Sequence, residues 1–469
     1  MDNGKIGARS ITLQEQRAIG GLDHQVPMIL LDGRTYDDNL DRFLLDLPLN
    51  GVRSRHSLRA YGYDLMIWVR FLEQACGKSV WEAVHSDIAA FHRARRRGDA
   101  GARISAASWN RSVAALDKLY RWAVVEGIVA SSPFMHRDEW RRGQGPRRVR
   151  VIARNEAYER AAKRMDVRFI SLEDYRVFRD VGLRGLTAAG AERPGARDRN
   201  STRNALFAEL LLTTGMRLEE ASFLLAAEIS DSAQATRGGQ GWFELPPALT
   251  KGDRGRRILM PGRVLHEISA YIDIERAHAI SKFRSRQGWE TIERPIFVHR
   301  RASGAASIPI RNGGAIPIEA LTPDERGRLV ICDDEGVPLE PAVLWLTEVG
   351  QPVQPNTWEA TFTRACRRCS AAGFPMQVSP HRLRHAFAVH MLAMLIQNRL
   401  RDASVAAGDA GTEAYHRMLG DPLQQVQRLL GHASLTTTYI YLDHVAGHAD
   451  TVDAAMEELL ALVPKVGNS

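Results

Sequence analysis

The chain has 469 residues, 44% of them hydrophobic, and a formal net charge of +8, which allows two or three globular domains. Its four cysteines are too few for a disulfide scaffold, and the sequence has no run of about 18 apolar residues that would cross a membrane. The stretch from Met1 to Arg9 is polar and unlike a secretory signal, so we expect a cytoplasmic protein.

The positive charge is concentrated in residues 51–160, where 21 Lys and Arg stand against 11 Asp and Glu. The excess of basic residues in this segment is larger than the excess in the whole chain. A basic domain beside a near-neutral remainder favours a polyanionic partner, with nucleic acid ahead of acidic lipid. A solvated, arginine-rich surface explains the charge about as well.

Residues 1–35 have weak periodicity and are expected to form an arm. Residues 36–136 are predicted to form a basic, all-helical domain, because apolar residues recur at steps of three and four from Ser54, over 84–97 and over 105–125. The face of the last helix that is turned away from the predicted core carries the candidate contacts to a polyanion, which are Asn110, Arg111, Lys118 and Arg121.

Residues 137–168 are rich in arginine and are punctuated by glycine and proline, which predicts a basic linker. Residues 169–469 are predicted to form a second domain that is mainly helical but contains a small β-sheet. In this domain we expect a helix over 172–178, an apolar helix pair over 204–225, short strands at 242–245 and 257–260, and an insertion near 300–345.

Two motifs early in the second domain are suited to phosphate chemistry. Gly215 lets the backbone turn, so that Arg217 begins the next helix and Glu220 follows one turn later. An arginine held by a carboxylate is a rigid, two-pronged phosphate clamp. Lys251 stands at the head of a tight turn, from which it can reach a cleft and protonate a leaving oxygen. Taken alone, these motifs are more often a helix-cap ion pair and a charged turn.

A third motif places His381 and Arg384 three positions apart on one helix face, while Arg382 and His385 are expected to point elsewhere. A histidine and an arginine on one face can combine proton transfer with charge neutralisation at one phosphate. A basic first turn with no chemical role is the alternative.

The last two motifs lie near the end of the chain. His432 follows Gly431 at a predicted turn between helices, where a buried, capped histidine is as common as a ligand. Tyr439 and Tyr441 stand two positions apart, about 200° around a helix, so only one of them can face a pocket. A tyrosine with an ordinary pKa near 10 is a weak nucleophile that needs a base and a positive pocket.

Together these residues describe one coherent site for a phosphodiester. Arginines and a histidine donate to the phosphate oxygens, a lysine protonates the leaving oxygen, a tyrosine attacks, and a histidine takes its proton. Such a site needs no metal ion. The lone Cys366–Cys369 pair, without a second pair at zinc-ligand spacing and in a predicted helix, is therefore not interpreted as a metal site.

These motifs, in this order, resemble the tyrosine recombinase or phage integrase family. The matching pieces are TTGMRLEE, TKGDRGRR, HRLRHAFAVH and LLGHASLTTTYIY, and the resemblance covers roughly residues 40–455. It implies a helical core-binding domain that contacts DNA, followed by an α+β catalytic domain. The resemblance further implies a role for each site residue. Arg217 and Arg384 would clamp the phosphate, Lys251 would be the general acid, and His381 would be the general base. His432 would be a phosphate ligand, and Tyr441 would be the nucleophile.

The resemblance implies a site-specific recombinase of integrase or transposase type, as found on mobile elements, which forms a 3′-phosphotyrosyl intermediate without metal, ATP or another cofactor. The implied partners are double-stranded DNA, three further copies of the chain in a tetramer, and accessory DNA-bending proteins. Apolar positions within 446–465 suit docking on a neighbouring copy.

The chain departs from the family pattern between Arg384 and His432, whose separation is about twice the usual one. We interpret residues 397–420 as a second insertion. The family's spacing favours Tyr441 over Tyr439 as the nucleophile. Two alternatives stay open at this point: a type IB topoisomerase with the same catalytic set, and a regulator that binds DNA without cleaving it.

Overall fold

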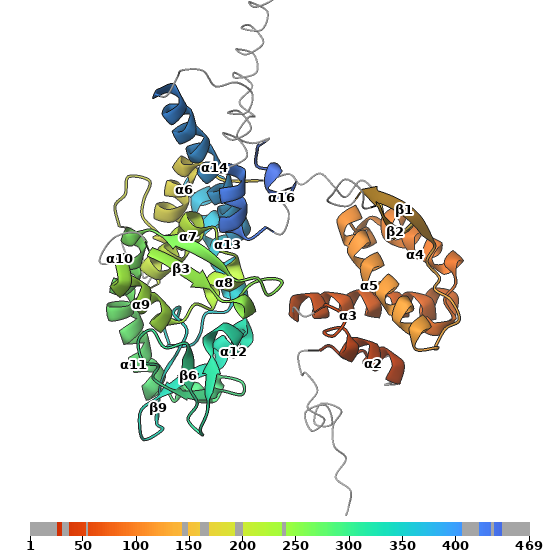
Figure 1. The fold of residues 1–469 in the computed structure, drawn as a ribbon, viewed down its shortest axis with the longest axis horizontal. Helices are drawn as coiled ribbons and strands as arrows, with labels where there is room; N and C mark the ends of the chain where they lie inside the picture. The colour runs from red at the N-terminus through yellow and green to blue at the C-terminus, as the bar shows by residue number, and fades with distance from the viewer. Residues whose placement is uncertain are drawn as a thin grey trace, which may run out of the picture. The chain divides into compact units, whose positions relative to one another are not determined.

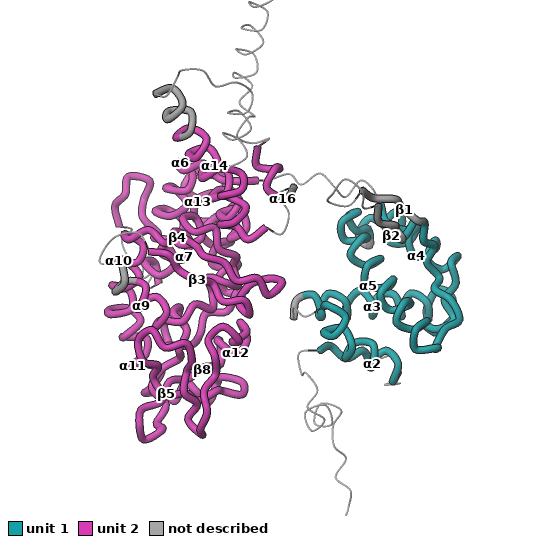
Figure 2. Tube along the Cα trace, viewed as in Figure 1, with its two compact units in different colours: residues 1–164 teal, residues 165–469 magenta. Residues whose placement is uncertain are grey.

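The computed structural model describes residues 26–30, 37–52, 55–142, 149–159, 168–192, 200–236, 241–405, 422–432 and 436–442. The chain divides into two compact units, residues 1–164 and 165–469, which Figure 2 colours separately. The prediction of a mainly helical chain with small β-sheets is confirmed (Figure 1). Most of the predicted arm and the whole predicted docking segment at 446–465 lie outside the described residues. No described helix is both long and apolar enough to span a membrane.

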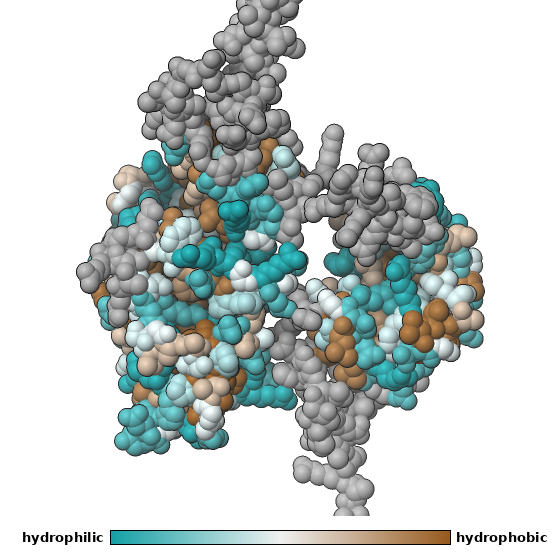
Figure 3. Space-filling view, in the orientation of Figure 1, coloured by the Kyte–Doolittle hydropathy of each residue, from teal (hydrophilic) through white to brown (hydrophobic). Residues whose placement is uncertain are grey.

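The first unit is a helical bundle, as its periodicity predicts. Its main helices are α2 (Asp38–Asp46), α3 (Arg55–Phe71), α4 (His85–Arg97) and α5 (Ala106–Val125). Aromatic rings fill the core, and their polar atoms are satisfied: the indole of Trp68 donates to the hydroxyl of Tyr120 at 2.8 Å, and that hydroxyl donates to the Val80 carbonyl at 2.8 Å. The coloured part of the face that this unit shows in Figure 3 is mostly hydrophilic, with a few hydrophobic spots.

The segment predicted as a linker contains a hairpin. Strand β1 (His136–Arg142) pairs antiparallel with β2 (Val149–Asn155). The residues after β2 pack on the first unit: the indole of Trp109 donates to the Ala157 carbonyl at 2.8 Å, and the guanidinium of Arg96 binds the Glu159 carboxylate at 2.9 Å. The described residues 137–142 and 149–159 therefore belong to the first unit.

The second unit is built around α7 (Ser201–Thr214), a helix buried on nearly all sides. Its Phe207 ring stacks on Trp358 with the two centroids 3.7 Å apart. The surrounding helices are α6 (Leu172–Val177), α8 (Leu218–Ser222), α9 (Ala226–Thr236), α10 (Gly262–Tyr271), α11 (Ala277–Ser285), α12 (Pro323–Arg328), α13 (Pro355–Ala371), α14 (Pro380–Val405) and α16 (Thr436–Tyr439), with residues 422–430 also helical. The apolar helix pair broken near Gly215 is thus confirmed.

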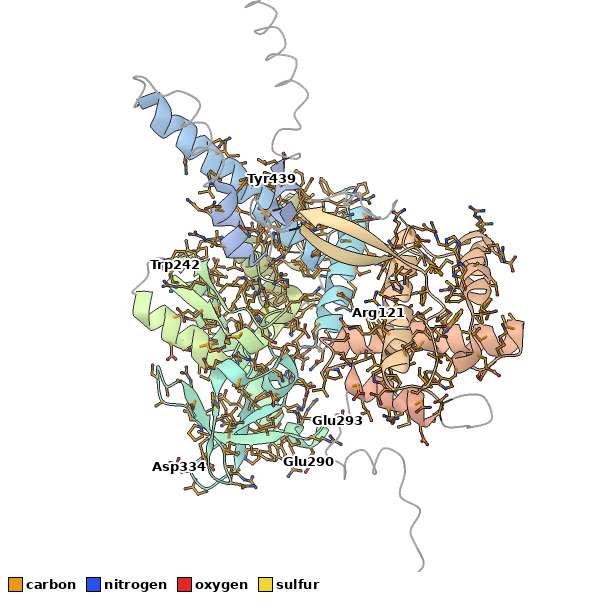
Figure 4. All side chains as sticks on the ribbon, turned by 45° about the vertical axis from the view of Figure 1, so that its right-hand side comes forward. Arg121, Trp242, Glu290, Glu293, Asp334 and Tyr439 are labelled. Carbon is orange, nitrogen blue, oxygen red and sulfur yellow. The ribbon has the colours of Figure 1, made fainter. Side chains whose placement is uncertain are left out.

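The two short strands predicted in the second unit are confirmed as β3 (Gly241–Leu245) and β4 (Arg256–Met260), an antiparallel hairpin. Phe243 points inward, whereas its neighbour Trp242 is exposed on the other face (Figure 4). Cys366 and Cys369 lie in helix α13, as expected.

The region predicted as an insertion near 300–345 is folded. Strands β5 (Ile296–His299), β8 (Leu329–Cys332) and β9 (Pro338–Pro341) form one sheet, and β6 (Ser307–Pro309) pairs with β7 (Ala315–Pro317). The fully buried Arg326 binds both carboxylate oxygens of Glu228 on α9, at 2.9 and 3.1 Å, which ties this region to the rest of the unit. Of the second predicted insertion, 397–420, the described part continues α14 to Val405.

Candidate active site

The turn between α7 and α8 places Arg217 beside Glu220, as the motif predicts. Gly215 ends α7 with a φ of +65°, and a Cβ at this position would stand 2.3 Å from the Phe387 ring, so the turn requires glycine. Arg217 is the N-cap of α8. Its backbone N–H donates to one Glu220 carboxylate oxygen at 2.7 Å, and its guanidinium donates to the other at 2.9 Å. The head group of Arg217 is thereby oriented.

A second arginine, which the sequence analysis missed, grips the same carboxylate. Arg256 on β4 donates to both Glu220 oxygens, at 2.8 and 2.6 Å, and its Nε donates to the Leu429 carbonyl at 3.0 Å. Burial raises the pKa of Glu220, but Arg256 and Arg217 outweigh it and hold that pKa at about 2. Strand alternation offered a signal, because Arg256 shares the inward face with Ile258 and Met260.

Arg384 reaches the same region from α14. It is 4% exposed, and its guanidinium donates to the carbonyl of Gly215 and to that of Leu430, the latter at 2.6 Å. Burial and the nearby charge of Arg217 lower the pKa of Arg384 to about 9, which leaves it positive at neutral pH. The structure thus brings the two predicted clamp arginines together.

The expectation that His385 points away from the site is wrong. Its Nδ1 lies 3.0 Å from the Tyr441 hydroxyl, and its ring packs against that of His381 with the two centroids 4.2 Å apart. On an α-helix, residues four apart are only about 40° apart around the axis, closer than residues three apart. His381 itself is exposed, and partial desolvation together with the charges of Arg384 and Arg217 lowers its pKa.

His432 occupies the turn predicted from the glycine before it, where Gly431 has a φ of +64°. The backbone N–H of His432 donates to the Gln427 carbonyl at 3.1 Å, and its Nδ1 lies 3.0 Å from the buried Thr438 hydroxyl. Burial, followed by the charges of Arg384 and other basic residues, lowers the pKa of His432 to about 4. The ring is therefore neutral at pH 7.

Of the two tyrosines, the structure turns Tyr441 inward and Tyr439 outward, as their spacing predicts. Tyr441 is 1% exposed and packs among apolar side chains that include Phe387 and Leu430, whereas Tyr439 is 49% exposed (Figure 4). Burial raises the pKa of Tyr441, and the charges of Arg384 and Arg217 oppose that shift. The inward phenol thus lies in the electrostatic field of two arginines.

Lys251 stands apart from this cluster in the contacts that the structure describes. It is exposed in the turn between β3 and β4, which the Thr250 hydroxyl braces by donating to the Arg254 carbonyl at 2.7 Å. Its assignment as the general acid stays a prediction.

The four DNA-contact candidates of the first unit all have intramolecular partners. Arg111 and Arg121 nevertheless keep about half of their side-chain surface exposed, 52% and 54% (Figure 4 labels Arg121). Their contact with DNA stays a prediction. The pairs are Asn110 with the Glu159 backbone at 2.9 and 3.0 Å, Arg111 with Asp64 at 2.9 Å, Lys118 with the Asn50 carbonyl at 2.9 Å, and Arg121 with Asp117 at 3.0 Å.

Chemically, the arrangement surrounds a buried phenol with two oriented arginines and two histidines. A phosphodiester here would be held by positive charge, next to a hydroxyl that lies within hydrogen-bond distance of an imidazole nitrogen.

The chain is similar to known proteins over most of its length. Residues 40–127 match the model for the phage integrase N-terminal SAM-like domain, and residues 191–400 match the phage integrase family. The chain is 25% identical over 408 residues to tyrosine recombinase XerD of Mycobacterium tuberculosis (strain ATCC 25618 / H37Rv), which covers 86% of this chain and 91% of that protein. It is 26% identical over 410 residues to XerD of Caulobacter vibrioides, covering 87% and 92%. A solved structure, XerH recombinase bound to palindromic difH substrate, is 15% identical, with a TM-score of 0.46 and 92% of each chain covered.

Proposed function

We propose that the chain, which belongs to the phage integrase family of tyrosine recombinases, is a site-specific DNA recombinase whose nucleophile is Tyr441. The observation that carries the proposal is the buried hydroxyl of Tyr441, which lies in the positive field of Arg217 and Arg384. A purely structural tyrosine does not need two oriented arginines around it.

In the proposed reaction, Arg217 and Arg384 bind the non-bridging oxygens of the scissile phosphate, and the neutral ring of His432 adds a further contact. The Tyr441 oxygen bonds to phosphorus while the bond to the 5′ oxygen breaks, and Lys251 gives that oxygen a proton. The product is a 3′-phosphotyrosyl bond and a 5′-hydroxyl. Attack by a 5′-hydroxyl from another strand reverses the step, so the bond energy is conserved and ATP is not consumed.

Double-stranded DNA is the proposed partner, and the protein works in the cytoplasm as a tetramer on paired recombination sites. The basic first unit is the surface that holds the DNA, with Arg111 and Arg121 exposed on α5. The apolar positions within 446–465 would dock on the neighbouring copy, and DNA-bending proteins would assist where the site requires it. Integration and transposition are the reactions that this chemistry serves.

The test is covalent capture on nicked suicide duplexes taken from the genomic surroundings of the gene. We expect a detergent-resistant protein–DNA adduct at Tyr441 that is lost in Tyr441→Phe. Tyr439→Phe, which changes the exposed neighbour, serves as the matched control and keeps the adduct. Binding to a verified site without any adduct would contradict the proposal. Relaxation of supercoiled DNA without a defined site would instead indicate a topoisomerase.

A further inference from the structure

The nucleophile of the proposed reaction contacts a histidine other than the one that the motif analysis assigned as the base. The Nδ1 of His385 lies 3.0 Å from the Tyr441 hydroxyl oxygen, and the two ring centroids are 5.7 Å apart. His381 is one helical turn earlier and exposed, and its described ring contact is with His385. His385 thus contacts both the His381 ring and the Tyr441 phenol, and it is the histidine next to the phenol.

Both partners of this contact lie among buried residues. His385 lies on α14 between the buried residues Arg384 and Ala386, and Tyr441 is 1% exposed in the apolar cluster formed by α14 and residues 422–430. A phenol buried in this way cannot pass its proton to bulk water. A proton acceptor has to lie within hydrogen-bond reach, about 2.6–3.2 Å, and His385 meets that condition.

Resting on the proposed function, we propose that His385 is the general base that takes the Tyr441 proton during cleavage. The O–H bond of Tyr441 breaks as its oxygen bonds to phosphorus, and the proton moves to Nδ1 of His385, which becomes an imidazolium. The 5′ oxygen leaves with a separate proton, given by Lys251. During rejoining the imidazolium returns its proton to the phenol as the P–O bond to Tyr441 breaks. His381, at the exposed side, is left to contact the phosphate.

This assignment fixes the tautomer that reacts. Neutral imidazole has one donor and one acceptor nitrogen, so Nδ1 can accept the phenol proton only while Nε2 carries the ring hydrogen. An asparagine at position 385 places an amide close to where Nδ1 stands. Such an amide can keep a hydrogen bond to Tyr441 but cannot take up its proton at neutral pH.

The experiment uses the full chain, nicked suicide duplexes and single-turnover cleavage at saturating protein. We expect His385→Asn to slow adduct formation by about a hundredfold or more, with DNA affinity and thermal unfolding midpoint unchanged. The matched control is His390→Asn, on the same helix, where the ring nitrogen faces the Ile170 carbonyl at 3.0 Å. That variant is expected to cleave at the unsubstituted rate.

A second measurement separates proton transfer from structural damage. Trifluorotyrosine at position 441 has a more acidic phenol and therefore depends less on a base. We expect it to restore most of the cleavage rate that His385→Asn loses, which a merely structural loss would not allow. The cleavage rate of His381→Asn is also measured with tyrosine and with trifluorotyrosine at position 441.

The outcomes separate this inference from the proposed function. Cleavage by His385→Asn at the unsubstituted rate would overturn the inference alone. So would recovery with trifluorotyrosine in His381→Asn but not in His385→Asn, since it would return the base role to His381. An unsubstituted chain that forms no adduct at Tyr441 on its verified site would overturn the proposed function, and this inference with it.

Discussion

Arg256 holds both carboxylate oxygens of Glu220, at 2.8 and 2.6 Å, while its Nε donates to the Leu429 carbonyl at 3.0 Å. One guanidinium thus connects the carboxylate that orients Arg217 with the end of the helical segment that leads to His432. The same residue therefore helps to position the proposed phosphate-binding Arg217 and the helical segment before His432.

Replacing Arg256 by lysine should reduce cleavage without weakening DNA binding. Lysine keeps the charge but cannot donate to two carboxylate oxygens and a carbonyl in one plane. We expect a fall of at least about tenfold in the single-turnover rate, in line with the loss of one charged hydrogen bond. Arg257→Lys is the matched control, because Arg257 is the next residue of β4 and its side chain is 62% exposed. Equal rates in the two variants would refute the positioning role.

Glu220 should make the second unit sensitive to acid. Its pKa is about 2 in the folded chain against an ordinary 4.5, so the ionised form stabilises the fold above pH 4.5. That stability, about 3 kcal/mol, is lost as the pH falls from 4.5 towards 2. Denaturant unfolding followed across this range should show a weaker pH dependence in Glu220→Gln. The matched control is Glu244→Gln, because Glu244 is exposed. This substitution should leave the pH dependence of the free energy of unfolding unchanged.

His432 should stay neutral well below its ordinary titration range. Its pKa is lowered from 6.5 to about 4, so acid destabilises the folded form between these values, where the unfolded chain binds the extra proton. NMR of the His432 ring should show a midpoint near pH 4, and bound DNA phosphate in Tyr441→Phe should raise it by offsetting the arginine charges. A midpoint above pH 6 in the DNA-free chain would contradict the geometry.

Most residues of the candidate site could be proposed from the sequence, because each stands in a local motif. Gly215 and Gly431 occur where the chain needs a positive φ, and both have one in the structure. The choice between Tyr439 and Tyr441 followed from helical spacing. The hairpin that carries Lys251 was predicted from two short apolar runs around a polar turn, and its strands pair as expected.

The errors have a common cause, which is that contacts between distant segments leave little local trace. His385 was set aside because only its spacing to neighbours on α14 was considered, whereas its partner Tyr441 is 56 residues away. Arg256 looked like one more arginine in a basic turn, since Glu220 and Leu429 come from other parts of the chain. In the first unit, the hairpin of β1 and β2 was hidden by its charge and by the glycines and proline between its strands.

A substitution at Gly431 tests the contact between Arg256 and the turn before His432 without removing a functional group. A Cβ at this position would stand 2.8 Å from Cδ of Arg256, and the φ of +64° adds backbone strain of about 1 kcal/mol. Gly431→Ala should therefore displace Arg256 and slow cleavage as Arg256→Lys does, with a lowered unfolding midpoint. Gly373→Ala is the matched control, because its φ of +91° brings similar strain while no atom lies within 4 Å of the added Cβ.

If both glycine variants lose stability alike and both still cleave at the unsubstituted rate, the close approach of Arg256 to this turn has no part in placing His432. A slowed Gly431→Ala beside a normal Gly373→Ala would instead show that the turn and the phosphate clamp act as one unit.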